Sequence, residues 1–307
     1  MSLTSFLKSP DVRERFRQEL RMPRAVADRE LLAPPLSKRY MLVGTAFDYL
    51  LRFYLQRITP DAIHGSWVAQ NGLMRLDQCV TYAYDTDTEE LTCEPDGGIF
   101  DKATNIFDRA RIAHERYLAS GRVTDQLLES TIHLAQLDGI YRAGFIDENL
   151  DENLGVAWPE DVQDLRNLIS IVRRNKFLAK DICLLNPSFG NASRLVGGAD
   201  ADLFIDGTLI DIKTTKNFKL DRLHFNQLIG YSVLHRLSGF SGITPKPKLS
   251  RVAIYFSRHA HLEVFDLSAL INPKTFPRFV KWFSERARQD KRCITRRSTE
   301  RAKAARR

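Results

Sequence analysis

The sequence of 307 residues has 43% hydrophobic and 10% aromatic side chains, which is enough apolar material for a substantial core. This composition excludes a disordered or fibrous chain. The formal net charge is +8, but residues 284–307 alone hold ten basic and three acidic side chains. We therefore expect an almost neutral globular body with one basic C-terminal tail, rather than a protein that is basic over its whole surface.

The cysteine pattern and the hydropathy exclude further classes. The four cysteines lie far apart and show no CxxC pairing, so neither a cysteine-ligated metal site nor a disulfide framework is expected. The N-terminus has no long apolar segment of the signal-peptide kind, and no run of about 18 uncharged apolar residues follows it. These features predict a cytoplasmic protein with no membrane partner.

The N-terminal half favours helices. Residues 1–40 predict a charged helix over 11–21 and then an extended segment, and residues 41–60 carry apolar side chains at helical spacing, which indicates a buried core helix. Residues 60–98 are mixed and do not indicate one type of element. Residues 99–177 are rich in Ala, Leu, Arg and Glu and predict a helical lobe.

The pattern changes to strands after residue 178. Apolar runs at 182–185, 203–205 and 209–212 predict three strands, followed by a helix over 223–237 and strands at 252–256 and 262–265. Asp206-Gly207 separates two of these runs. Because a type I′ turn needs two residues that tolerate positive φ, Asp-Gly at this point predicts a tight β-hairpin.

The register of this hairpin would bring charged residues together. Counting outward from the turn pairs Asp202 with Asp211 and Asp200 with Lys213. Side chains alternate between the faces of a strand, so these four project from one face. The other face carries only apolar side chains, which are Leu203, Ile205, Ile210 and Ile212. We therefore expect three carboxylates and one ammonium group on one patch.

Opposed carboxylates repel each other and destabilise a hairpin unless a cation lies between them. Oxygen ligands of this kind suit Mg²⁺ or Mn²⁺, which bind one or two protein carboxylates together with a substrate phosphate. A neighbouring lysine can position the attacking water and neutralise charge on the phosphate. An isolated Asp-x-Lys is most often an ordinary half-exposed strand, but the register and the second acid favour metal-assisted phosphodiester hydrolysis.

Three segments in this order resemble the PD-(D/E)xK nuclease superfamily, and within it the RecB-like branch. They are Gly198-Ala-Asp-Ala-Asp-Leu-Phe-Ile205, Asp211-Ile-Lys213 and Gln227-Leu-Ile-Gly-Tyr231. The resemblance implies that Asp202 and Asp211 are metal ligands and that Lys213 is the catalytic lysine. It also implies that Gln227 supports the lysine or contacts the cleaved strand, and that Tyr231 faces the site from the same side of a helix.

Two ligand positions leave alternatives open. Asp202 is the expected first strand ligand, but a Gly-x-Asp reading or a bulge would favour Asp200. RecB-like nucleases also carry an upstream G-x-x-x-(His/Glu) helix, which Gly44-Thr-Ala-Phe-Asp48 resembles with Asp48 as a third metal ligand. The alternative for Asp48 is a partly buried capping or salt-bridged residue on a core helix.

The resemblance implies an α/β fold with a restriction-endonuclease-like αβββαβ core, in which helices flank a mixed central sheet. Residues 41–60 and 178–283 would form this nuclease core, residues 99–177 a large helical insertion, and residues 284–307 the basic tail. The implied activity is Mg²⁺- or Mn²⁺-dependent hydrolysis of DNA, with RNA as an alternative substrate. A helicase or another protein is a further possible partner, and the competing hypothesis is a catalytically silent module for nucleic-acid binding or assembly.

Overall fold

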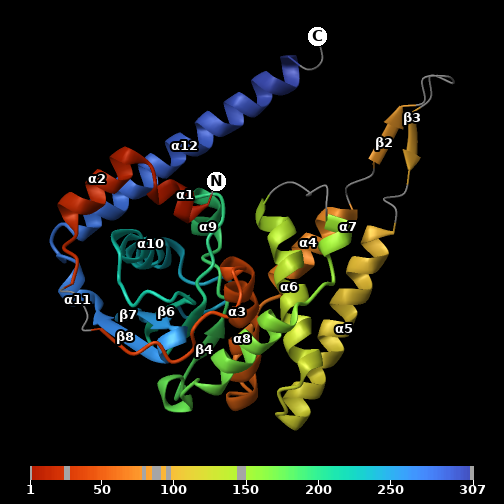
Figure 1. The fold of residues 1–307 in the computed structure, drawn as a ribbon. Coiled ribbons are helices and arrows are strands. Elements are labelled where there is room, and N and C mark those ends of the chain that lie inside the picture. Colours follow the sequence, from red (N-terminus) through yellow and green to blue (C-terminus); the bar gives the residue numbers. More distant parts are fainter. Residues whose placement is uncertain are drawn as a thin grey trace.

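A computed structural model of the chain describes residues 2–23, 28–77, 81–84, 91–94, 98–143 and 150–304. The protein is an α/β structure built on a six-stranded mixed sheet with strand order β1-β4-β5-β6-β7-β8 (Figure 1). The strands of this sheet are β1 (Ile63–His64), β4 (Cys183–Leu185), β5 (Leu203–Ile205), β6 (Thr208–Lys213), β7 (Arg251–Phe256) and β8 (His261–Asp266). A separate hairpin pairs β2 (Thr81–Tyr84) with β3 (Leu91–Glu94).

Helices cover both faces of the sheet (Figure 1). The hydrophobic cluster on one side of the sheet includes residues of α1 (Leu3–Leu7), α2 (Pro10–Glu19), α9 (Asn191–Leu195), α10 (Arg222–Ser238), α11 (Leu267–Leu270) and α12 (Phe276–Ala304). The cluster on the other side includes residues of α3 (Tyr40–Ile58), α4 (Val68–Asp77), α5 (Ile99–Ser120), α6 (Asp125–Ala143), α7 (Leu150–Asn153) and α8 (Pro159–Ser170). The sheet therefore separates two hydrophobic cores.

The predicted hairpin is present with the predicted turn. Asp206 and Gly207 have φ angles of 44° and 81°, as the two central residues of a type I′ turn require. The β5–β6 ladder runs from Ile205–Thr208 to Leu203–Ile210. The apolar side chains predicted to share one face of this hairpin all lie in the core beneath α3: Leu203, Ile205, Ile210 and Ile212. The alternation in the sequence therefore assigned the faces correctly.

The helices that lie between α3 and β4 in the sequence do not form a separate core. Their buried residues join those of α3 and one face of the sheet in a single cluster. Within this cluster α4 packs closely on α6, because a Cβ atom on Gly72 would come within 1.9 Å of the Leu137 carbonyl oxygen. Only glycine allows that approach, which fixes α4 against α6.

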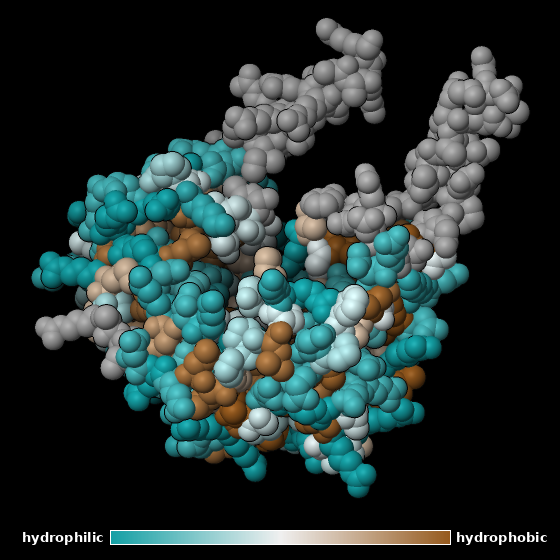
Figure 2. Space-filling model, viewed as in Figure 1, coloured by the Kyte–Doolittle hydropathy of each residue, from teal (hydrophilic) through white to brown (hydrophobic). Residues whose placement is uncertain are grey.

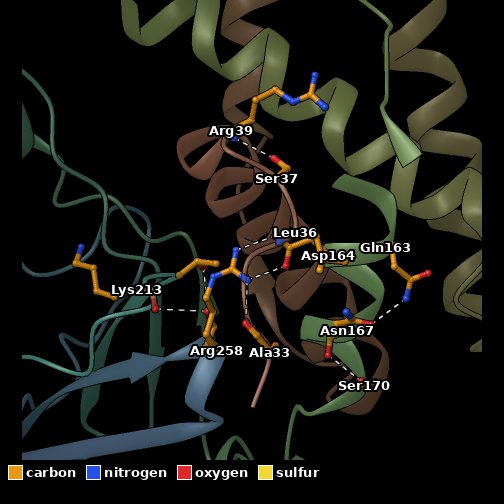
Figure 3. Close-up of polar contacts among 12 residues, drawn as sticks. Ala33, Leu36, Ser37, Arg39, Gln163, Asp164, Asn167, Ser170, Lys213 and Arg258 are labelled. Carbon is orange, nitrogen blue, oxygen red and sulfur yellow. Dashed lines mark hydrogen bonds and ion pairs between the residues drawn. The ribbon is translucent and has the colours of Figure 1, made fainter. Parts of the chain in front are cut away.

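A buried ion pair joins this helical layer to the sheet (Figure 3). Asp164 of α8 and Arg258, which follows β7, form a bidentate pair with N–O distances of 2.7 and 2.9 Å. Arg258 Nη1 also donates to the Ala33 carbonyl at 3.0 Å, and the Arg258 carbonyl accepts from the backbone N–H groups of Leu32 and Ala33. The segment before α3 is thereby held between α8 and the sheet.

Most of the predicted basic tail is the C-terminal part of helix α12. Residues 284–304 belong to α12, and Arg286 near the start of this stretch donates to Asp11 of α2 at 2.6 Å. The face of the molecule in Figure 2 is largely hydrophilic, with hydrophobic residues in separate patches. Among the described residues, none of the helices has both the length and the apolar character needed to cross a membrane.

Candidate active site

The two strand acids lie where the β5–β6 hairpin opens. The backbone ladder ends at Leu203–Ile210, so the predicted pairing of Asp202 with Asp211 is not part of it. Instead Asp202 Oδ2 accepts a hydrogen bond from the Ile212 backbone N–H at 2.6 Å. The carboxylate thus takes the place of a backbone carbonyl, which ends the ladder and holds the Asp202 side chain over β6.

Four predicted residues form one continuous chain of polar contacts. Lys213 Nζ lies 2.8 Å from Asp211 Oδ2 and donates to Gln227 Oε1 at 3.2 Å. Gln227 Nε2 in turn donates to the Tyr231 hydroxyl at 2.8 Å. The two α10 residues are four apart and share one helix face, as the sequence predicted. Helix α10 begins beside the site because the Asp221 side chain caps it at the His224 N–H, at 2.8 Å.

The backbone of Asp200 forms an antiparallel bridge with Ser188, which continues the β4–β5 register on one edge of the strand. On the other edge, the predicted pairing of Asp200 with Lys213 is not part of the β5–β6 ladder, which ends at Leu203–Ile210. That prediction was wrong because it extended the ladder beyond the point where the Asp202 side chain ends it. Burial raises the pKa of Asp200, and the opposing charges come from Arg142 and Arg52 rather than from the lysine.

Asp48 reaches the site from α3. Gly44, one turn earlier, lies against Thr214, since a Cβ atom added to this glycine would stand 3.7 Å from the Thr214 Cβ. Asp48 Oδ2 forms an ion pair of 2.5 Å with Arg52, whereas Oδ1 is buried and has no hydrogen-bond partner among the described residues. Asp48 is therefore salt-bridged, as the alternative proposed, and one of its oxygens meets no donor from the described part of the chain.

Burial and like charges shift the pKa values of this cluster. Burial raises the pKa of Asp202 to about 6, and the charge of Asp211 adds to the shift. Burial likewise raises the pKa of Asp48 to about 6, although Arg52 opposes it. Burial lowers the pKa of Lys213, but the charges of Asp211 and Asp202 outweigh this and raise it overall. The lysine is therefore a cation, and ionisation of the buried carboxyl groups carries a free-energy cost.

The donor chemistry fits a hard divalent cation. Asp202 and Asp211 supply carboxylates at the hairpin opening, and the unpartnered Asp48 oxygen adds a third potential ligand. Mg²⁺ and Mn²⁺ prefer oxygen ligands and commonly take only one or two carboxylates from the protein. Within the part of the chain that the structure describes, no group of three His, Cys, Asp or Glu side chains forms a ready cluster for a metal ion. Water and substrate oxygens would have to complete the shell.

The site includes residues that the sequence analysis did not select. Arg52 pairs with Asp48, and Asp138 of α6 binds both Arg142 and the Tyr49 hydroxyl. The spacing in the sequence is consistent with ion pairs, because Asp48 and Arg52, like Asp138 and Arg142, lie four residues apart on a helix. Such pairs are common on helix surfaces, and only the fold shows that these two lie at the acid cluster.

We expect Asp202→Asn to stabilise the metal-free protein at pH 8 by about 1–3 kcal/mol. A carboxyl group whose pKa rises to about 6 on folding favours the fold while protonated, and this contribution is lost as the pH rises through that value. Asparagine removes the charge and still accepts the Ile212 N–H. The gain should be large at pH 8 and nearly absent at pH 4, as measured by urea unfolding in EDTA.

Asp206→Asn is the matched control, for which the expected change in stability at pH 8 has the opposite sign. The Asp206 carboxylate accepts backbone N–H groups from Lys180, Asp181 and Ile182 at 2.7, 3.0 and 3.0 Å. Burial raises the pKa of Asp206, but these bonds outweigh that and lower it overall. This substitution should therefore destabilise the protein at pH 8, with a smaller loss as the pH falls. A destabilising effect of Asp202→Asn at pH 8 would contradict the assigned electrostatics.

No protein-family model, curated protein or solved structure matches this chain.

Proposed function

We propose that the protein is a divalent-metal-dependent nuclease that hydrolyses phosphodiester bonds, with DNA as its substrate. The observation that carries this proposal is the convergence of Asp202, Asp211 and Lys213 at one end of the hairpin, with Gln227 bonded to the lysine. Two buried acids of raised pKa beside a lysine cost stability. Such a cost is typical of a catalytic site.

The order of elements supports the same proposal. Helix α3 precedes β4, β5 and β6, which are antiparallel neighbours, and α10 then connects β6 to the parallel strand β7. This is the αβββαβ order expected of a restriction-endonuclease-like core. Helices α5 to α8 fall within residues 99–177, where the helical insertion was expected, and α4 precedes them in a segment for which no element was predicted.

In this mechanism Asp202 and Asp211, with Asp48, would hold Mg²⁺ or Mn²⁺. The bound ion supplies Lewis acidity to the scissile phosphate and neutralises charge on the carboxylates. Lys213 orients the attacking water and stabilises negative charge that develops on the phosphate. Gln227 keeps the ammonium group in place through its 3.2 Å hydrogen bond, and Tyr231 fixes the orientation of the Gln227 amide. The products would be a 5′-phosphate and a 3′-hydroxyl.

Purified protein incubated with circular and linear DNA, single- and double-stranded, tests the proposal. We expect cleavage in Mn²⁺ or Mg²⁺ and none in EDTA, with loss of cleavage in Asp211→Asn. Cutting of circular substrates would show that free ends are unnecessary, and a parallel RNA substrate tests the alternative polymer. Binding of DNA without cleavage under every metal condition would contradict the nuclease and favour a silent binding module.

A further inference from the structure

Helix α6 carries a polar network to the edge of the site. Asp138 and Arg142 lie four residues apart on this helix, which packs along α3 (Figure 1). The Asp138 carboxylate accepts from the Tyr49 hydroxyl at 3.2 Å and from the guanidinium of Arg142. Tyr49 directly follows Asp48, and the ring of Tyr49 lies 4.4 Å from the Arg52 guanidinium. The acid on α3 and the arginine on α6 are therefore parts of one connected assembly.

The two ends of the Asp138–Arg142 pair differ in exposure. The Asp138 side chain is 2% exposed, whereas that of Arg142 is 58% exposed. Nε and Nη2 of Arg142 bond to the carboxylate, and Nη1 has no partner among the residues that the structure describes. A buried carboxylate thus fixes the orientation of a guanidinium that belongs to a largely exposed side chain. An arginine held in this way is preorganised for an oxyanion.

The charge of Arg142 acts on the acids of the site. It is the largest influence that opposes the burial-driven rise in the pKa of Asp200, and it also opposes, more weakly than Arg52 does, the rise in the pKa of Asp48. The other cations near these acids are already engaged. Arg52 is buried against Asp48, and Lys213 is held by Asp211 and Gln227.

A cluster of carboxylates repels a polyanionic substrate, so a nuclease site needs cationic groups that meet the backbone phosphates. We propose that Arg142 binds a phosphate of the nucleic-acid strand beside the scissile bond, with Asp138 as its positioning residue. This inference rests on the proposed nuclease function and names the helical layer as a contributor to its substrate site. The layer then supplies a substrate contact in addition to its packing role.

Comparison of Arg142→Ala with Arg111→Ala tests the assignment. Arg111 of α5 is equally exposed at 60% and is paired on its own helix with Asp108, but it belongs to no network at the site. We expect Arg142→Ala to lower the cleavage rate at subsaturating DNA about 10- to 100-fold, which is the loss expected for one charge-assisted hydrogen bond to a neighbouring phosphate. Arg111→Ala should cleave like the wild type. Arg142→Lys should recover part of the rate because lysine keeps the positive charge but lacks the planar, bidentate donors of the guanidinium.

Binding provides a readout that does not require turnover. The affinity for a labelled oligonucleotide can be measured by fluorescence anisotropy in Ca²⁺ over a range of salt concentrations. The slope of log affinity against log salt concentration should be smaller for Arg142→Ala by the amount expected for about one phosphate contact. An Arg142→Ala protein that equals Arg111→Ala in both rate and slope would overturn the proposal. If the wild type never cleaves but its binding slope depends on Arg142, the nuclease fails while the phosphate contact holds. If the wild type neither cleaves nor binds, both fail.

Discussion

Lys213→Ala is expected to lower the metal-dependent cleavage rate by about 1,000-fold or more. The structure places the Lys213 ammonium group against both a strand acid and the α10 glutamine, at 2.8 and 3.2 Å. Its removal takes away the group that orients water and the charge that meets the developing phosphate anion. Single-turnover cleavage of a labelled duplex in Mn²⁺ measures the loss at the chemical step.

The same substitution also affects folding, which the control must separate from catalysis. Asp211 is 1% exposed, and removing Lys213 leaves its carboxylate buried without a counter-charge. The double variant Lys213→Met with Asp211→Asn makes the pair neutral, so it should fold at least as well as Lys213→Ala and still be inactive. Lys216→Ala, in the exposed turn after β6, should keep its activity. Cleavage at the wild-type rate by folded Lys213→Ala would refute the role of the lysine.

The hairpin was predictable because local chemistry determines it. Asp206-Gly207 selects the turn, the turn fixes the register, and alternation then assigns the faces of the strands. The facing of Gln227 and Tyr231 was predictable for a similar reason, since residues four apart share a helix face. Each of these inferences depends on residues that are close together in the sequence.

The prediction for Asp200 shows where such local reasoning ends. Alternation assumes that a ladder continues, but a short polar side chain can replace a backbone partner and end it. Asp202 does this by accepting the Ile212 N–H, and the β5–β6 ladder therefore ends before it reaches Asp200. No periodicity in the sequence indicates which of two nearby aspartates will bond to the backbone.

Contacts between the helical layer and the site were beyond local reasoning altogether. Tyr49 meets Asp138 across 89 residues, and Arg258 meets Asp164 across 94. The residues at each end are ordinary helix or loop residues in the sequence, and only the packing of α6 and α8 brings the partners together. The sequence predicted a helical lobe but not that it would share a core with the sheet or direct an arginine to the acids.

Asp164→Ala is expected to destabilise the protein by about 3–5 kcal/mol, the cost of leaving a buried charge unpaired. Its partner Arg258, which meets Asp164 in Figure 3, is 1% exposed, so its guanidinium cannot be solvated in place of the lost carboxylate. Equilibrium urea unfolding at neutral pH measures the loss. Because Ser257, next to Arg258, donates to the Thr214 hydroxyl at 3.0 Å, displacement of Arg258 should also disturb the end of β6 that carries Lys213.

Asp161→Ala is the matched control on the same helix. Asp161 is as buried as Asp164, but its partner Arg39 is 37% exposed and can be solvated when the carboxylate is removed, so the loss should be distinctly smaller. Asp164→Leu with Arg258→Met should recover part of the stability, since both charges leave together. Recovery stays incomplete because the Ala33 carbonyl and the Leu36 N–H lose their partners. Equal losses in Asp161→Ala and Asp164→Ala would show that burial of the arginine does not determine the cost.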